Sequence, residues 1–453
     1  MGTEIMQIHD RTDANVARTI ALARSEALVR QTLAETGGFS AKERVRTCDF
    51  EHEAFAVNRT TGEPIDAISV FSRDDLGTRP DTTRFIVEYD ANGPTPITSD
   101  GLNQLYRSFV ERTREIESCL PDEAMLVPMG VHPFLSAAQA SEWLDSGNID
   151  RYRLLNQVTQ NENPVKTICT RNSLRDYEVV ETAANLTAMT RCAATQFHIS
   201  EVCVEDALDA QVTATAIAPV KIALFGSSPF MFGMDTGKVS SRIDLLGQSE
   251  QRRSGLTQPS ATLFAYYNRI LHLDPPFMEI VDQRQALELT HGATHPVSRI
   301  IADPDNQTIR VEYRHDDSLP PFEAMQSFLF TLGAVEAFRY SDERPSFSQS
   351  LKDFKTAPLG LFAPMHWNGQ SGLAKELGLV IIGKVTQSLN LMGLGSLADE
   401  FLDPLTDQIA SGITQADKMK EIYYNDIDGG ATLHQAAVEV MRYRNRQGLM
   451  DLV

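Results

Sequence analysis

Four glutamates and one histidine in this sequence have the residue types and spacing that could bind metal ions. Glu51 and Glu53 lie two residues apart, while Glu88, His198 and Glu312 lie in three separate apolar segments. Carboxylate oxygens are the ligands that Mg²⁺ prefers, and an imidazole nitrogen is tolerated beside them. If strands bring these side chains together, they could hold two or three Mg²⁺ ions, and such ions bind the phosphates of ATP.

Two arginines, Arg242 and Arg314, extend this hypothesis because their forked donors suit phosphoryl oxygens. Each residue also has a simpler explanation. A pair of glutamates two apart on a strand is usually a solvated face, and a single histidine is usually a core or surface residue. The combination of acids, a histidine and arginines on strand-like segments is what favours phosphate chemistry.

The segments around these residues predict strands with one polar side. Strands are expected at Cys48–Val57, at Thr83–Tyr89, at 189–203 and at Gln307–Arg314. In the first, alternation places Phe50, His52, Ala54 and Ala56 on one side, and Asp49, Glu51, Glu53 and Phe55 on the other. In the last, it separates Ile309, Val311 and Tyr313 from Arg310, Glu312 and Arg314.

Helices are predicted between these strands. Helical spacing of apolar residues, with cap and stop signals, favours helices near 12–36, 100–118, 137–145, 204–225, 259–271 and 320–340, and through most of 345–453. The fold class is therefore α+β, with a mostly antiparallel sheet that has helices on one face and an open, wet face on the other. The sequence shows no repeat or flexible linker, which predicts one composite domain.

Composition excludes several classes of protein. The chain has 453 residues, with 41 Lys and Arg against 61 Asp and Glu, a net charge of −20. An acidic balance argues against a nucleic-acid partner, and no apolar run is long enough to predict a membrane span. The N-terminus lacks the apolar segment of a signal peptide. Five scattered cysteines without a C-x-x-C pair predict reduced thiols in a cytoplasmic protein.

Two nucleotide-binding motifs are incomplete. Gly233–Ser240 suggests a phosphate-binding loop, but Val239 follows the lysine where Ser or Thr should stand. The sequence 393–398 fits G-x-G-x-x-A, but the strand-like run Leu379–Ile382 ends about ten residues earlier, too far for a dinucleotide site.

An ordered set of motifs resembles the glutamate–cysteine ligase type 2 family. The motifs are FEHEAF (50–55), VHPF (131–134), RYRLL (151–155), QFHIS (196–200), FGSSPFMFGMDTGKVSSRI (225–243) and TIRVEYR (308–314). SSPF followed by G-x-x-T-G and S-x-R is the most specific of them. The resemblance runs from about 45 to 340 and is weaker in 341–453, where HWNGQSGL (366–373) matches a Trp-containing segment.

The resemblance implies a glutamine-synthetase-like catalytic fold and a role for each site residue. It assigns metal binding to Glu51, Glu53, Glu88, His198 and Glu312. It assigns catalysis to Glu312 and Arg314, with Arg314 on phosphate, and a substrate carboxylate or phosphate to Arg242, with Ser227 and Ser228 nearby. Gln196 departs from the pattern because it replaces the first histidine of the family's H-x-H.

The family's members are ATP-dependent carboxylate–amine ligases, so the implied substrates are ATP and small amino acids or amines, as in glutathione biosynthesis. Glutamate's γ-carboxylate would be phosphorylated, and an amine such as cysteine would then displace phosphate. A different acid and amine, or a non-catalytic relative that binds a nucleotide or amino acid, remain alternatives. The implied organisation is an N-terminal helical extension (1–44), a catalytic core (45–340) and a helical C-terminal part of the same domain (341–453). A homodimer is common for enzymes of this size.

Overall fold

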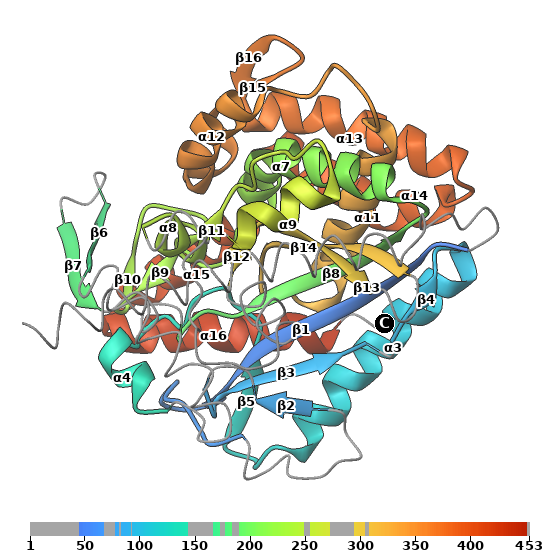
Figure 1. The fold of residues 1–453 in the computed structure, drawn as a ribbon. Coiled ribbons are helices and arrows are strands. Elements are labelled where there is room, and N and C mark those ends of the chain that lie inside the picture. The colour runs from blue at the N-terminus through green and yellow to red at the C-terminus, as the bar shows by residue number, and fades with distance from the viewer. Residues whose placement is uncertain are drawn as a thin grey trace, which may run out of the picture.

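The structure is a computed structural model that describes residues 45–67, 78–80, 83–91, 93–143, 166–172, 177–183, 190–248, 254–271, 294–303 and 308–450. The helix predicted at 12–36 and the motif at 151–155 lie outside these residues. Within the described ranges, the chain forms one large sheet with helices packed against it (Figure 1).

The large sheet is antiparallel throughout its described pairs, which confirms the predicted fold class. Its main path runs β13 (Ser298–Asp303), β14 (Thr308–Asp317), β8 (Ala194–Glu201), β1 (Thr47–Asn58), β3 (Ile86–Asp90) and β2 (Thr78–Pro80). β4 (Thr95–Pro96) and β5 (Ala124–Val127) also pair with β1. The four predicted strands therefore correspond to β1, β3, β8 and β14.

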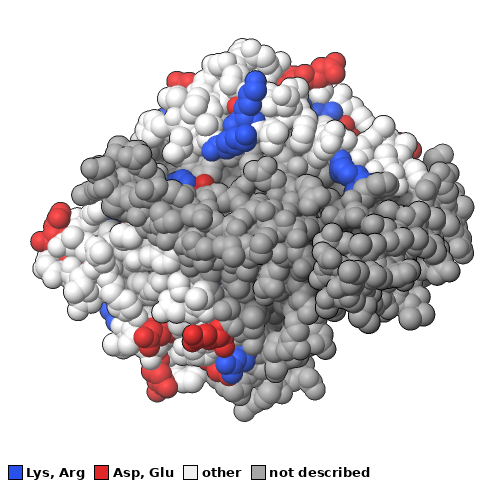
Figure 2. Space-filling view, turned by 60° about the vertical axis from the view of Figure 1, so that its left-hand side comes forward, with Lys and Arg blue, Asp and Glu red and all other residues white. Residues whose placement is uncertain are grey.

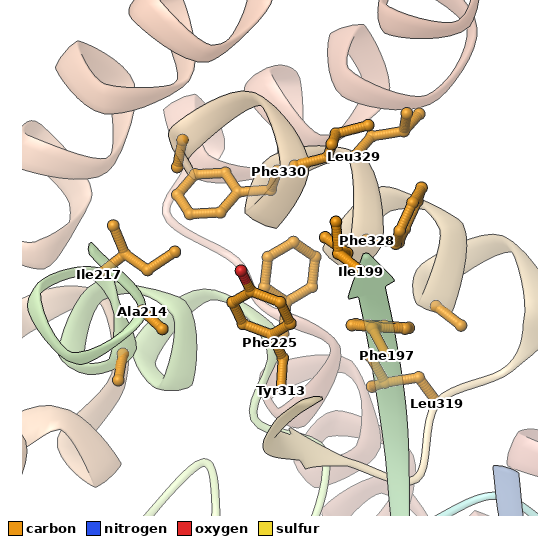
Figure 3. Packing of buried hydrophobic residues seen from close by; sticks show 14 of the residues in the cluster. Phe197, Ile199, Ala214, Ile217, Phe225, Tyr313, Leu319, Phe328, Leu329 and Phe330 are labelled. Atoms are coloured by element: carbon orange, nitrogen blue, oxygen red, sulfur yellow. The ribbon is translucent and has the colours of Figure 1, made fainter. Parts of the chain in front are cut away.

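One face of this sheet is the hydrophobic core. Helices α3 (Ser99–Cys119), α7 (Val204–Phe225) and α11 (Pro321–Ala337) pack on it. Phe50 of β1 lies 5.0 Å, between ring centroids, from Phe328 of α11, and Phe197 of β8 lies 5.7 Å from the same ring. Figure 3 shows Phe197 and Ile199 of β8 beside Phe328. Alternation along each strand then directs the polar residues to the opposite face.

The other elements surround this core. The helices are α4 (Ala137–Ser141), α8 (Ser241–Gln248), α9 (Leu263–Leu271), α12 (Phe347–Thr356), the 3₁₀ helix η2 (Ala357–Phe362), α13 (Ala374–Leu391), α14 (Gly395–Ser411), α15 (Gln415–Asp428) and α16 (Leu433–Met450). Small antiparallel pairs are β6 (Lys166–Asn172) with β7 (Tyr177–Ala183), β9 (Phe230–Met231) with β10 (Met234–Asp235), and β15 (Pro364–Trp367) with β16 (Gln370–Leu373). β11 (Ser254–Gly255) and β12 (His295–Pro296) pair in parallel.

The strand-like interpretation of Leu379–Ile382 is wrong, because this run lies inside α13. Leu377, Ile381 and Val385 are buried at a spacing of four residues, so the run contributes to one apolar face of a helix. α13 packs against α11, which extends the hydrophobic core into the C-terminal part of the chain.

Helix α7 is long and apolar enough to span a membrane by length and composition. However, 89% of its most apolar window is buried inside the protein, so this helix belongs to the hydrophobic core. Figure 1 shows this helix enclosed between the sheet and the C-terminal helices. On the face drawn in Figure 2, basic and acidic side chains lie in small separate groups. The described part of that face therefore offers no broad basic surface for a nucleic acid.

We expect Phe328→Ala to lower the free energy of unfolding by about 3–5 kcal/mol, because it empties a fully buried position between two other rings. Urea denaturation monitored by circular dichroism measures this loss. The control is Leu391→Ala at an 86% exposed position, which should change stability by less than about 0.5 kcal/mol. Equal effects of the two variants would contradict the described core.

Burial lowers the pKa of His132 to about 3, because its ring lies among Phe55, Phe85 and Phe134. The unfolded chain binds a proton near the ordinary value of 6.5, so stability from this histidine is lost as pH falls below 6.5. We expect wild type to lose roughly 2 kcal/mol more than His132→Leu between about pH 7 and about pH 5. Denaturation curves at both pH values measure the difference, and parallel losses would contradict the burial of a neutral ring.

Candidate functional site

Strand register places Glu51, His198 and Glu312 together on the polar face of the sheet. β8 lies between β1 and β14, and His198 pairs with Asp49 on one side and with Glu312 on the other. Glu51 is two residues along β1 on the same face. One ligand atom from each of the three side chains lies within 4.8 Å of the others. The distance from His198 Nε2 to Glu51 Oε1 is 3.2 Å.

This donor set fits a divalent cation. Two carboxylates and one imidazole, close enough for a single ion, are ligands that Mg²⁺ and similar ions accept. His198 and Glu312 are buried, and Glu51 is partly exposed, which leaves the group accessible from one side. Three of the five metal ligands predicted from the sequence are therefore brought together.

Two arginines form ion pairs with Glu312, which is fully buried. Arg299 stands directly opposite it on β13 and contacts both carboxylate oxygens, with Nη2 3.1 Å from Oε1. The Arg314 Nε atom lies 3.6 Å from Oε1. Burial alone would raise the pKa of Glu312, but the two guanidiniums hold it well below its usual range. Glu312 is therefore an anion at neutral pH.

The surroundings of Arg314 disfavour its positive charge. Burial, followed by the positive charge of Arg299, lowers its pKa. Its Nη1 donates to the carbonyl oxygen of Thr294 at 3.3 Å. The carboxylates of Glu312, Glu53 and Glu51 act in the opposite direction. The forked donors of a guanidinium are a kind of group from which phosphoryl oxygens accept hydrogen bonds. Sequence reasoning found Arg314 but missed Arg299, because nothing in the sequence reveals which residue of β13 pairs with Glu312.

A third arginine restricts the chemistry of His198. Arg310 Nε lies 3.2 Å from His198 Nδ1. A guanidinium only donates, so Nδ1 accepts, and the proton of the neutral ring is on Nε2, which faces Glu51. A cation bound through Nε2 would require the other tautomer. The contact with Arg310 would therefore compete with metal binding by His198, just as the contacts of Arg299 with both oxygens of Glu312 would compete with metal binding by that carboxylate.

Glu53 and Glu88 lie on the same face but outside the three-residue group. The two oxygens of Glu53 accept hydrogen bonds from the backbone of Ala194 and from Gln196 Nε2, each at 2.8 Å. Glu88 pairs with Glu53 across β1 and β3. Their assignment to metal stays a prediction. Gln196, which departs from the family pattern, is thus a hydrogen-bond partner of Glu53.

Ser227, Ser228 and Arg242 lie beside the end of β14. Both serines are fully buried, and Ser228 Oγ donates to the carboxylate of Asp317 at 2.7 Å. Arg242 donates to the carbonyl oxygens of Asp316 and Arg314, at 3.0 and 3.2 Å. The side chain of Arg242 therefore contacts the backbone of Arg314. The two serines instead bind Asp317. Their contact with a substrate stays a prediction, and Asp317 was not predicted at all.

Comparisons with known proteins identify the family and the fold. The model of the family described as Glutamate-cysteine ligase family 2 (GCS2) matches residues 50–331, more than half of the chain. The fold is similar to that of the glutamate–cysteine ligase of Francisella tularensis in complex with AMP, with a TM-score of 0.60, 10% identity and 90% of each chain covered. It is also similar to a bifunctional glutathione synthetase of Pasteurella multocida, with a TM-score of 0.57 and 10% identity, covering 94% of this chain and 55% of that one. No curated protein matches the sequence.

We expect Mn²⁺, used as a spectroscopic substitute for Mg²⁺, to bind at the group formed by Glu51, His198 and Glu312. Removing one carboxylate charge in Glu51→Gln or Glu312→Gln should weaken binding at least about tenfold. Electron paramagnetic resonance of free Mn²⁺ measures this without any catalytic turnover. Glu115→Gln on the surface of α3 is the control, and an equal loss in this control would contradict the site.

Proposed function

Because the chain belongs to glutamate–cysteine ligase family 2, we propose that it is an ATP-dependent carboxylate–amine ligase. The observation that carries the proposal is the group of Glu51, His198 and Glu312, with Arg299 and Arg314 against it, on the polar face of the sheet. Anionic ligands for cations lie beside cationic donors for phosphate. This arrangement suits a reaction in which two anions must meet.

The proposed reaction has two steps and needs no nucleophile from the protein. An oxygen of the substrate carboxylate attacks the γ-phosphorus of ATP, and the bond to ADP breaks, which gives an acyl phosphate. The nitrogen of an amine then attacks the acyl carbon. The C–O bond to phosphate breaks, the nitrogen loses a proton, and the products are an amide and inorganic phosphate.

The chain's own residues would lower the barrier by orientation and charge. Arg314 would bind the transferring phosphoryl group, while Arg299 keeps Glu312 in place. Glu51, Glu312 and His198 would hold Mg²⁺, with Glu53 and Glu88 as further candidates for a second or third ion. Bound Mg²⁺ would offset the repulsion between the phosphates of ATP and the attacking carboxylate.

For substrates, we propose the γ-carboxylate of glutamate and an amine, with cysteine as the first candidate. Gln196 favours a second candidate, the same chemistry with another amine or acid, because it replaces a family histidine and uses its amide to bind Glu53. We also propose that 45–340 is the catalytic core, with 341–453 as its helical continuation, and that the protein is cytoplasmic. Four cysteines are free among the described residues, which supports a reducing compartment.

We expect ADP release to require both an acid and an amine. The experiment measures ADP across a panel of amino acids and amines, each with and without glutamate, in the presence of ATP and Mg²⁺. Release that depends on glutamate plus one amine, with an amide product in equal amount, supports the proposal. ATP binding without ADP release for every pair would instead indicate a non-catalytic relative.

With an active pair, we expect Glu312→Gln and Glu53→Gln each to lower turnover about 100-fold or more. Loss of one preorganised charge typically costs at least ~3 kcal/mol of transition-state stabilisation. Circular dichroism should show that both variants remain folded. Turnover like that of wild type in both variants would remove these residues from the reaction.

A further inference from the structure

A bulge in β14 decides which of two neighbouring aspartates faces the candidate site. Glu312 pairs with His198 on the polar face, but the pairing register of β14 with β8 shifts between Tyr313 and Asp316. Without the shift, alternation would place Asp316 on the polar face, as it places Glu312 and Arg314. Because the bulge adds one residue to β14, Asp317 lies on the polar face instead.

The contacts of the two aspartates confirm this division. Asp316 turns to the helical side, where its carboxylate accepts from Lys221 of α7 at 2.6 Å and from Ser327 of α11 at 2.9 Å. Asp317 turns to the polar side and receives three donors from a single loop. These are the backbone N–H of Ser227 at 2.8 Å, Ser228 Oγ at 2.7 Å and Ser240 Oγ at 2.9 Å.

Asp317 therefore joins both ends of the loop 227–242 to the sheet. It is 2% exposed, and a Cβ at Gly130 would lie 2.3 Å from its Cγ, so the backbone closes over it on another side. The chain also bonds to itself across the base of the loop, because Ser228 N–H donates to Val239 at 2.9 Å and Ser241 N–H to Ser228 at 2.9 Å. A buried carboxylate that accepts three short hydrogen bonds from one loop strongly restricts the conformation of that loop.

This loop positions Arg242 next to the candidate site. Arg242 is the second residue of α8, its backbone N–H lies 3.4 Å from Ser228 Oγ, and the residue is 6% exposed. Its guanidinium donates to the carbonyls of Arg314, which lies in the bulge, and of Asp316, which follows it. The position of Arg242 thus depends on the loop and on the bulged part of β14 together.

We propose that Asp317 is a positioning residue, which fixes the loop 227–242 and so sets Arg242 beside Arg314 for binding of the anionic substrate. This role rests on the proposed ligase function. It requires no contact between Asp317 and the substrate. In this proposal, Ser227, Ser228 and Ser240 donate hydrogen bonds to a buried carboxylate and do not bind the substrate.

The test compares two kinds of variant in the full chain. Asp317→Asn replaces the carboxylate by an amide, which can no longer accept at both positions, and Ser240→Ala removes one donor while leaving the carboxylate. Ser327→Ala is the matched control, because it removes one equally long hydrogen bond from the neighbouring Asp316, on the helical side. Hydrogen exchange followed by mass spectrometry reports on the loop, and steady-state kinetics report KM and kcat for the acid substrate.

We expect Asp317→Asn to speed exchange in 227–242 at least about tenfold, with little change in β8, and to raise KM for the acid about tenfold with a smaller effect on kcat. Ser240→Ala should change both in the same direction, and Ser327→Ala should change neither. Unchanged exchange in the loop, or faster exchange with an unchanged KM, overturns the proposal. If wild type releases no ADP with any pair, the proposed function fails, whereas exchange still decides whether Asp317 fixes the loop.

Discussion

The site depends on the register of three antiparallel strands that have the hydrophobic core on their other face. Side chains alternate along a strand, so a slip of one residue in β8 would exchange His198 with Phe197. The aromatic contacts of Phe50 and Phe197 with Phe328 oppose such a slip, because Phe197 would leave the core and a polar ring would enter it. Packing on the helical face therefore fixes the positions of Glu51, His198 and Glu312 on the polar face.

The polar face concentrates charge in a way that folding alone does not require. Glu312 is fully buried, and a buried ion pair typically contributes little to stability once the loss of hydration is included. Arg299 and Arg314 nevertheless both approach it, and Arg310 approaches His198. The result is a preorganised set of acceptors for cations and donors for anions. Preorganised charge of this kind is what a transition state with developing charge needs.

The sequence predicted the elements whose apolar residues repeat at the spacing of a strand or a helix. The alternation of β1 and β14 and the helical runs of α3, α7 and α11 were all identified, and with them the polar residues of each strand. It could not predict which residues of distant strands pair with one another. Arg299 was missed because only the register of β13 with β14 sets it opposite Glu312, and Asp317 was missed because the bulge that turns it to the site leaves no local signal. Leu379–Ile382 was misread because four adjacent apolar residues fit either a strand or a buried helix.

The central claim is that a substrate carboxylate is activated by phosphorylation on this sheet face. The most direct test supplies the acid substrate with both carboxylate oxygens labelled with ¹⁸O, together with ATP and the amine, and analyses the released phosphate by mass spectrometry. The account predicts one ¹⁸O atom in each phosphate, because the oxygen that attacks the γ-phosphorus leaves with it when the amide forms. Phosphate without ¹⁸O, released in step with amide formation, would contradict it.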